Sequence, residues 1–287
     1  MPPITRHSGF TLIELMVTLV VSAIVVSFVS MFISGPVRGF MDQARRARLV
    51  DAADSALQRI GRDVRRALPN SVRTTSAGGV VALEVLSTVD GGRYRAQPPG
   101  TAAQVLDFAA ADGSFNVLGP FTQVTKPFTS TSYYLAIYNV GVPGADAYEL
   151  ANVITPAATQ IDIAVDGATG EDRVTLSPAF RFAYGSPSQR VFLVDGPVTY
   201  LCSTVAGTLT RYQGYSIATS QAARDSNAEL LAAGASASLI ADQLTGCTFT
   251  YTPGSAERGG LLVLQFTISS QGESVSLLSQ VHVDNVP

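Results

Sequence analysis

One ionisable side chain interrupts a long apolar segment near the amino terminus. Residues Phe10–Ile33 form a run of 24 residues in which Glu14 is the only ionisable side chain. At about 1.5 Å per residue, a helix of this length spans the roughly 30 Å hydrocarbon core of a bilayer. A carboxylate inside such a span is costly and by default marks a function that involves a partner. Glu14 is therefore the first candidate functional residue.

The segment that precedes this run is short and basic. Residues Met1–Gly9 carry Arg6 and the initiator amine, which favours a cytoplasmic location for this end of the chain. A secretory signal peptide would have a shorter apolar region followed by a small-residue cleavage site, whereas here the small residue Gly9 comes before the run. The simplest interpretation of these residues is a single membrane span that acts as a signal anchor.

Few other side chains have the types and spacing that catalysis or metal binding needs. The chain has only two histidines and two cysteines, namely His7, His282, Cys202 and Cys247. It contains no glycine-rich phosphate loop, no Gly-x-Ser-x-Gly elbow and no His-Glu-x-x-His motif. Asp146 and Glu149 are the nearest, weak candidates for a calcium loop. We therefore expect a non-catalytic protein with no metal and no cofactor.

The composition describes a folded protein with an uneven distribution of charge. Hydrophobic residues make up 46% of the 287 residues and charged residues only 14%, which excludes a disordered chain. The net charge of −3 gives no reason to expect nucleic acid. Within this sum, residues 38–73 hold nine arginines against four aspartates, and everything after residue 73 is acidic on balance.

A second helical segment follows the apolar run. Pro36 removes a backbone donor, so we expect it to kink or interrupt the helix. Helical periodicity then resumes and continues up to Pro69, which prevents the preceding residue from staying helical. The apolar positions recur every three or four residues on one face, at Leu49, Ala53, Leu57, Ile60, Val64 and Leu68. This face is expected to lie on a sheet.

The rest of the chain has the alternation and the turn residues of short β-strands. Predicted strands are Val80–Leu86, Tyr133–Val140, Gln160–Val165, Phe180–Tyr184, Arg190–Val194, a hairpin of Val198–Cys202 and Leu209–Tyr212, then Thr248–Thr252, Leu261–Ile268 and Val275–Val283. The alanine-rich segment Gln221–Leu244 is predicted to be a helix or a helical loop. The expected fold class is α+β, with a long amino-terminal helix packed on an antiparallel β-sheet domain.

The string Gly9-Phe10-Thr11-Leu12-Ile13-Glu14 resembles the class III leader of type IV pilins and pseudopilins. The resemblance implies that a prepilin peptidase cleaves after Gly9 and methylates the new amino terminus at Phe10. Glu14 becomes the fifth residue of the mature chain, and in that family this carboxylate pairs with the terminal ammonium of a neighbouring subunit. The physical reason is that two opposite charges in lipid need each other.

Further stretches are similar to the MshO family of MSHA (mannose-sensitive haemagglutinin) pilus biogenesis proteins. They are Gly35–Val37, Arg45–Ala47 with Leu49–Asp54, Arg62–Arg73, Arg190–Cys202 and Gln280–Pro287. The resemblance implies a minor pilin with a leader over 1–9, a transmembrane and fibre-core helix over 10–35, an amphipathic helix over 36–69 and a periplasmic β-rich head over 70–287. Residues 90–185 resemble nothing that we can place.

The resemblance also implies the partners and the location of the protein. Its partners would be other minor pilins, the major pilin, the prepilin peptidase and the inner-membrane assembly platform, with no nucleic acid. The protein would cross the inner membrane once, with a periplasmic head, before it enters the fibre at the cell surface. Two alternatives stay open, a pseudopilin of type II secretion and a ligand-binding tip adhesin or DNA receptor.

The two cysteines are expected to form a structural disulfide if the domain is exported. Cys202 and Cys247 are an even pair in a domain that would lie in the periplasm, which implies a disulfide. In the chain-entropy model, closing this loop stabilises the fold by roughly 4 kcal/mol. Two unpaired buried thiols are the alternative, because the sequence does not show that the two Cα atoms approach each other.

The arginines of the amphipathic segment have two competing interpretations. A solvated helix face, with arginine stems covering apolar surface, is the simpler one. The functional one is an electrostatic contact with acidic surfaces of neighbouring subunits. DNA binding is weaker, because aspartates dilute the stripe and aromatic residues are not interleaved. The candidate contact residues are Arg45, Arg46, Arg48, Arg62, Arg65 and Arg66.

Processing at the leader gives a first prediction. Mass spectrometry of the mature protein from the membrane fraction should find a methylated Phe10 at the amino terminus, because the resemblance implies cleavage after Gly9. A mature protein that still begins at Met1 would refute it.

Overall fold

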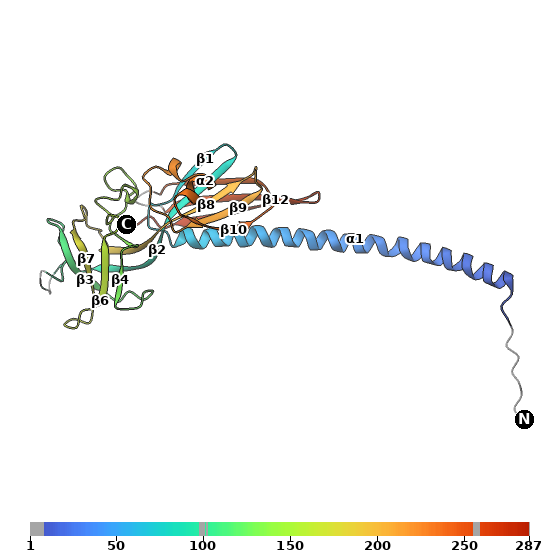
Figure 1. The fold of residues 1–287 in the computed structure, drawn as a ribbon, viewed down its shortest axis with the longest axis horizontal. Coiled ribbons are helices and arrows are strands. Elements are labelled where there is room, and N and C mark those ends of the chain that lie inside the picture. Colours follow the sequence, from blue (N-terminus) through green and yellow to red (C-terminus); the bar gives the residue numbers. More distant parts are fainter. Residues whose placement is uncertain (1–8, 98–100, 102, 255–258, 287) are drawn as a thin grey trace, which may run out of the picture.

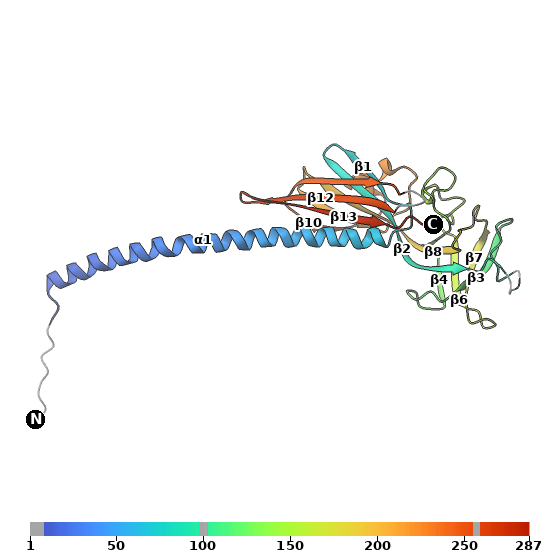
Figure 2. The same ribbon diagram turned by 180° about the vertical axis from the view of Figure 1, so that it is seen from behind.

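The computed structural model describes residues 9–97, 101, 103–254 and 259–286. The expected leader falls mostly outside these residues. A single long helix, α1 (Leu12–Arg65), leads into a head made of β-strands and short helices. Figures 1 and 2 show that only the carboxyl-terminal part of α1 lies against the head, while the rest projects away from it as a gently curved rod. The amino end of the helix is therefore far from every strand.

The helix is continuous through Pro36, so of the two expected effects, a kink or an interruption, the interruption does not occur. The 54 residues of α1 include this proline in an unbroken helical segment. Proline removes one backbone donor from the ladder. The flanking bonds remain, and no residue of this region is buried against the head in a way that would force the chain to turn. The helix therefore continues despite the loss of one backbone hydrogen bond at Pro36.

The periodic apolar face of the second half packs as predicted. Its side chains are buried under the sheets, and Ala53, Ala56 and Ile60 are completely covered. At Gly61, a Cβ atom would lie 3.5 Å from Cγ2 of Val281, so the helix and the last strand are in close contact there. The buried helical residues are Leu49, Ala53, Ala56, Leu57, Ile60, Gly61 and Val64.

The helix ends at Arg65, three residues before the expected end at Leu68. The amide of Leu68 donates to the carbonyl of Leu86 at 2.8 Å, and Ala67 forms an isolated bridge with Ser87. The chain therefore begins to pair with the sheet before Pro69 is reached. The proline constrains the chain, but the tertiary pairing ends the helix earlier.

In the described part of the chain the strands form two antiparallel sheets, which confirms the α+β class. In the larger sheet the order is β10-β9-β8-β2-β3-β7-β6-β4, with β1 on β2 and β5 on β8, and the smaller sheet has the order β11-β12-β13. The bounds are β1 Arg73–Ala77, β2 Val80–Tyr94, β3 Asp112–Leu118, β4 Phe128–Ser130, β5 Tyr134–Ala136, β6 Gln160–Val165, β7 Asp172–Phe180, β8 Arg190–Ser203, β9 Thr208–Gln213, β10 Ser236–Ala241, β11 Leu244–Thr252, β12 Gly260–Ser270 and β13 Glu273–Val283. Short helices are η1 Ala147–Glu149, η2 Gln221–Ala223 and α2 Asn227–Ala232.

Two long paired strands, β2 and β8, run through the whole head and divide it into two lobes. The first half of β2 pairs with the second half of β8 near α1, as in Val81 opposite Cys202. The second half of β2 pairs with the first half of β8 far from α1, as in Gly91 opposite Phe192. Irregularities of register at residues 87–90 separate the two regions. In Figure 1 the lobe with β3, β4, β6 and β7 lies beyond the end of the helix. We call it the distal lobe and the part on α1 the proximal lobe.

Each lobe has its own hydrophobic core. The proximal core joins α1 to both sheets, for example through Ile60, Tyr200 and Phe266. The distal core is built around side chains such as Phe115 and Ile163 and includes nothing from α1. Residues 90–185, which resemble no family that we can place, supply most of the distal lobe between β2 and β8.

A disulfide between Cys202 and Cys247 joins the two sheets of the proximal lobe. Cys202 lies on β8 of the larger sheet and Cys247 on β11 of the smaller one, with Cα atoms 6.4 Å apart. The bridge closes the segment that contains β9, α2 and β10. Its role is to hold the two layers together.

Several strand predictions are correct in place, and others differ. Gln160–Val165 has the predicted bounds, and the hairpin of β8 and β9 is present with Cys202 opposite Leu209. The predicted strand Tyr133–Val140 shrinks to β5, because Tyr138 has a φ of 60°, which extended backbone does not allow.

The predicted strand Phe180–Tyr184 is also wrong. Strand β7 ends at Phe180, and the following residues form a loop. Phe182 is completely buried there, with its ring edge-on to Phe180 at 4.9 Å between centroids. The apolar residues of this segment therefore indicate burial in the distal core and not an extended strand.

The alanine-rich segment Gln221–Leu244 is helical only in part. It contains η2 and α2, but α2 ends before Gly234, which has a φ of 84°. The next residues form β10 along the edge of β9. Alanine favours helix locally, and the free edge of β9 outweighs that preference.

The buried helix face gives a second prediction. Ile60→Ala should lower the free energy of unfolding by about 2–5 kcal/mol, because it leaves a cavity between α1 and both sheets. The measurement is chemical denaturation of the full-length protein in detergent. Ser55→Ala, on the exposed face of the same helix, should change it by less than about 0.5 kcal/mol. Equal losses in the two variants would contradict the packing described here.

Candidate functional site

The first turn of α1 is closed by reciprocal hydrogen bonds between Thr11 and Glu14. Thr11 is the N-cap, and its hydroxyl accepts from the amide of Glu14 at 3.3 Å. The Glu14 carboxylate in turn accepts from the amide of Thr11. This is a capping box, whose signature in the sequence is a threonine followed three residues later by a glutamate. The box turns the carboxylate back toward the start of the helix.

The bonds that hold the Glu14 carboxylate are weak. Oε2 lies 3.5 Å from both the amide and the hydroxyl of Thr11, beyond the normal range for such bonds. The carboxylate is exposed, and no cation of this chain forms an ion pair with it among the described residues. The carboxylate can therefore still accept stronger, charge-assisted hydrogen bonds from a cation of another molecule.

The first half of α1 is an apolar surface that the rest of the chain leaves uncovered. Its most apolar window has a mean hydropathy of 2.6 and no buried residue, and α1 is long and apolar enough to cross a membrane. Leu12 and Phe32 of this helix are more than three-quarters exposed, and so is Phe10, which precedes the helix. Such a surface needs lipid or other apolar helices around it, since water around it is unfavourable.

These features agree with what the comparisons find at this end of the chain. Residues 4–30 match the prokaryotic N-terminal methylation motif. This motif is type IV prepilin-like. This supports a type IV pilin or pseudopilin, and with the apolar helix it fits a pilin anchored in the inner membrane. Pilins of this type assemble with other pilins after processing by a prepilin peptidase, and the family is generally non-catalytic. No curated protein and no solved structure gives a significant match.

The structure divides the candidate arginines into two groups. Arg45 pairs with Asp42 at 3.2 Å, and Arg46 approaches Glu273 at 3.9 Å. The others make no ion pair within the part of the chain that the structure describes. This second group consists of Arg48, Arg62, Arg65 and Arg66.

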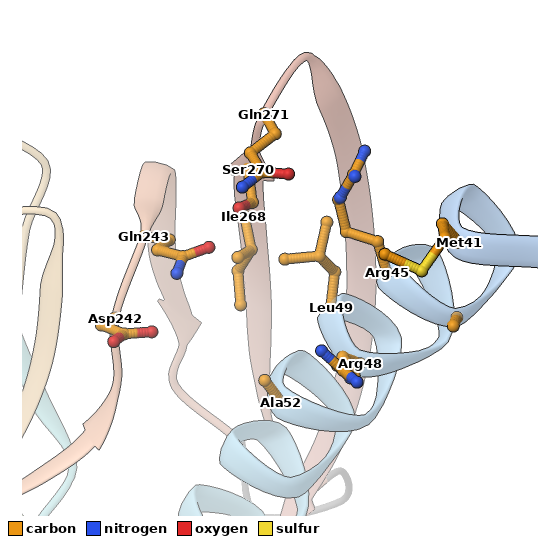
Figure 3. Close-up of a pocket in the computed structure, with 11 residues that line it drawn as sticks. Met41, Arg45, Arg48, Leu49, Ala52, Asp242, Gln243, Ile268, Ser270 and Gln271 are labelled. Atoms are coloured by element: carbon orange, nitrogen blue, oxygen red, sulfur yellow. The ribbon is translucent and has the colours of Figure 1, made fainter. Parts of the chain in front are cut away.

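A groove of about 410 Å³ lies where α1 leaves the head. Figure 3 shows Leu49 of the helix opposite Ile268 of β12, with Asp242 and Gln243 on the wall that faces the helix. Arg45 and Arg48 also line this groove, on the helix side. Guanidinium and carboxylate groups therefore lie across from each other around an apolar floor.

The weak calcium candidates have local structural roles. Asp146 accepts from the amide of Tyr148 at 3.0 Å, and Glu149 accepts from the amide of Gly144 at 2.9 Å. Burial raises the pKa of Asp146. Within residues 9–97, 101, 103–254 and 259–286, no cluster of three potential metal ligands occurs. His282 is exposed on β13 without a catalytic neighbour in its described surroundings.

The most buried charge in the head belongs to a structural network. The carboxylate of Glu84 is fully buried, and it pairs with Arg73 at 2.8 Å. The guanidinium also donates to two carbonyls of the loop after β9 and stacks over the ring of Tyr148. Burial is the main cause that raises the pKa of Glu84, and the charge of Arg73 opposes it. The network fixes that loop against β1 and β2.

The capping box makes a third prediction testable with a matched control. Glu14→Ala should still insert into the membrane but should be strongly depleted from assembled fibres, because it lacks the charge that a partner would pair with. Thr11→Ala breaks the same capping box and keeps the carboxylate, so it should assemble nearly as well as wild type. The readout is the ratio of fibre-bound to membrane-bound protein on immunoblots. Equal defects in both variants would assign Glu14 to helix capping alone.

Proposed function

We propose that this chain is a minor pilin of an MSHA-type type IV pilus, of the MshO kind, that acts in pilus assembly or initiation, or at the pilus tip. In this proposal the protein is non-catalytic and uses no cofactor. The observation that carries the proposal is Glu14 at the start of an uncovered apolar helix, within the methylation motif of residues 4–30. The stretches that resemble the MshO family support the finer assignment.

The proposal gives each part of α1 a task. Cleavage after Gly9 and methylation of Phe10 would produce the mature end, and Glu14 would pair with the terminal ammonium of a neighbouring subunit. The apolar half would lie first in the inner membrane and then in the fibre core. The amphipathic half would carry a periplasmic head, which moves to the cell surface with the fibre. The partners are the prepilin peptidase, the assembly platform, the major pilin and other minor pilins.

The size of the head supports a subunit of low copy number. The distal lobe extends beyond the end of α1, on the side away from the membrane helix (Figure 1). A repeating subunit would have to accommodate this lobe at every position of the fibre. A subunit at the tip, or one used only to initiate assembly, avoids that packing problem.

The test is deletion of the gene, followed by counting of surface pili by electron microscopy. We expect few or no pili, because initiation would be lost, and restoration by a plasmid copy of the wild-type gene. Normal piliation and adhesion in the deletion strain would contradict the proposal. Normal piliation with a defect in protein secretion would favour a type II pseudopilin, and normal piliation with a defect only in adhesion or DNA uptake would favour a tip receptor.

A further inference from the structure

Four arginines in the last turns of α1 and at its C-cap make no ion pair within the described chain. All four are exposed, and their guanidinium groups form no ion pair or hydrogen bond within the described chain. They are Arg59, Arg62, Arg65 and Arg66. Three of them, Arg62, Arg65 and Arg66, are among the candidate contact residues of the sequence analysis. They differ from Arg45 and Arg46, which face carboxylates of their own chain.

Two aspartates close to these arginines in the sequence have hydrogen-bond partners other than the arginines. Asp63 turns into the head, where it accepts from the hydroxyl of Tyr200 at 2.8 Å and from Nε of Arg211 at 2.7 Å. Asp54 accepts from the side-chain amide of Gln58 at 2.6 Å. The surface around Arg62 is therefore more positive than the charge count along the helix suggests.

A cleft of about 280 Å³ lies beside two of these arginines, between α1 and β13. Its apolar lining comes from Leu57, Gly61 and Val281, and Arg62 and Arg65 belong to its polar lining. The other polar residues that line it are Asp54, Gln58 and Ser279. The two guanidinium groups outnumber the one carboxylate of the lining, Asp54, which accepts a hydrogen bond from Gln58. The cleft therefore suits a further carboxylate, which a guanidinium binds with two parallel hydrogen bonds. We call this site the arginine cleft.

Assembly into a fibre would change the surroundings of these arginine side chains. The arginines lie on the face of α1 that the head leaves uncovered, so subunits that pack around the helix would remove their water. An unpaired guanidinium that loses its water is costly, and pairing with a carboxylate offsets that cost. From these contacts we infer that the arginine cleft docks an aspartate- or glutamate-bearing segment of a neighbouring pilus subunit. The inference rests on the proposed function and names the chemistry of the partner.

Arg62 and Arg65 also interact favourably with the carboxyl end of the helix, where cations stabilise the aligned peptide dipoles. An experiment must therefore separate a loss of stability from a loss of docking. The amount of full-length protein in the membrane reports stability, and the amount in sheared fibres reports docking.

The first test replaces both cleft arginines in the full-length protein, in a strain that lacks the chromosomal copy. Arg62→Gln/Arg65→Gln should reach normal membrane levels but should be about tenfold less abundant in sheared fibres, since two paired charges are lost. The control Arg93→Gln/Arg181→Gln removes two exposed arginines of the distal lobe and should be incorporated like wild type. Wild-type incorporation of the cleft variant, or an equal loss in the control, would overturn the inference.

The second test does not depend on the stability of a charge variant. A photo-crosslinking amino acid at Gln58, on the rim of the cleft, should give adducts with another subunit in intact fibres, and the crosslinked peptide should contain aspartate or glutamate. Adducts with peptides that lack both residues, with DNA or with lipid would overturn the inference. If the crosslinked peptide contains a carboxylate but the deletion strain has normal pili, the docking inference is supported and the proposed role in pilus assembly is contradicted. Absence of the wild-type protein from fibres would overturn both.

Discussion

Burial of one face of α1 between two sheets is the interaction on which the rest of the structure depends. Ala53, Ala56 and Ile60 are fully covered there, in a core that also takes side chains from β8, β12 and β13. A helix that buries one face exposes the opposite one, because its side chains repeat every 3.6 residues. The same packing therefore sets where the helix leaves the head and which arginines face outward.

The two candidate contacts of this chain lie near opposite ends of one rigid element. Glu14 is in the first turn of α1, and Arg62 is in its last turn. An unbroken helix of this length separates them by about 70 Å, at 1.5 Å per residue. Neighbouring subunits would therefore meet this chain at two distinct levels of a fibre, one apolar with a single carboxylate and one basic.

The distal lobe shows how a pilin-like head can grow without disturbing its contact with the helix. The long strands β2 and β8 pass from one core to the other, and their register shifts at residues 87–90. Because the distal core uses no side chain of α1, residues 90–185 can vary in shape while the proximal lobe, the disulfide and the helix keep their packing.

The sequence by itself determined the features that depend on neighbours along the chain: the apolar run with Glu14, the one-sided periodicity from Leu49 to Val64, and strands such as Gln160–Val165. It could not determine that Pro36 leaves the helix intact, that β9 recruits an alanine-rich segment as β10, or that Phe182 is buried in a loop. Those outcomes depend on contacts between residues distant in the chain. The same is true of the arginine cleft, because Asp63 had to be turned toward Arg211 before the charge of Arg62 and its neighbours was left unbalanced.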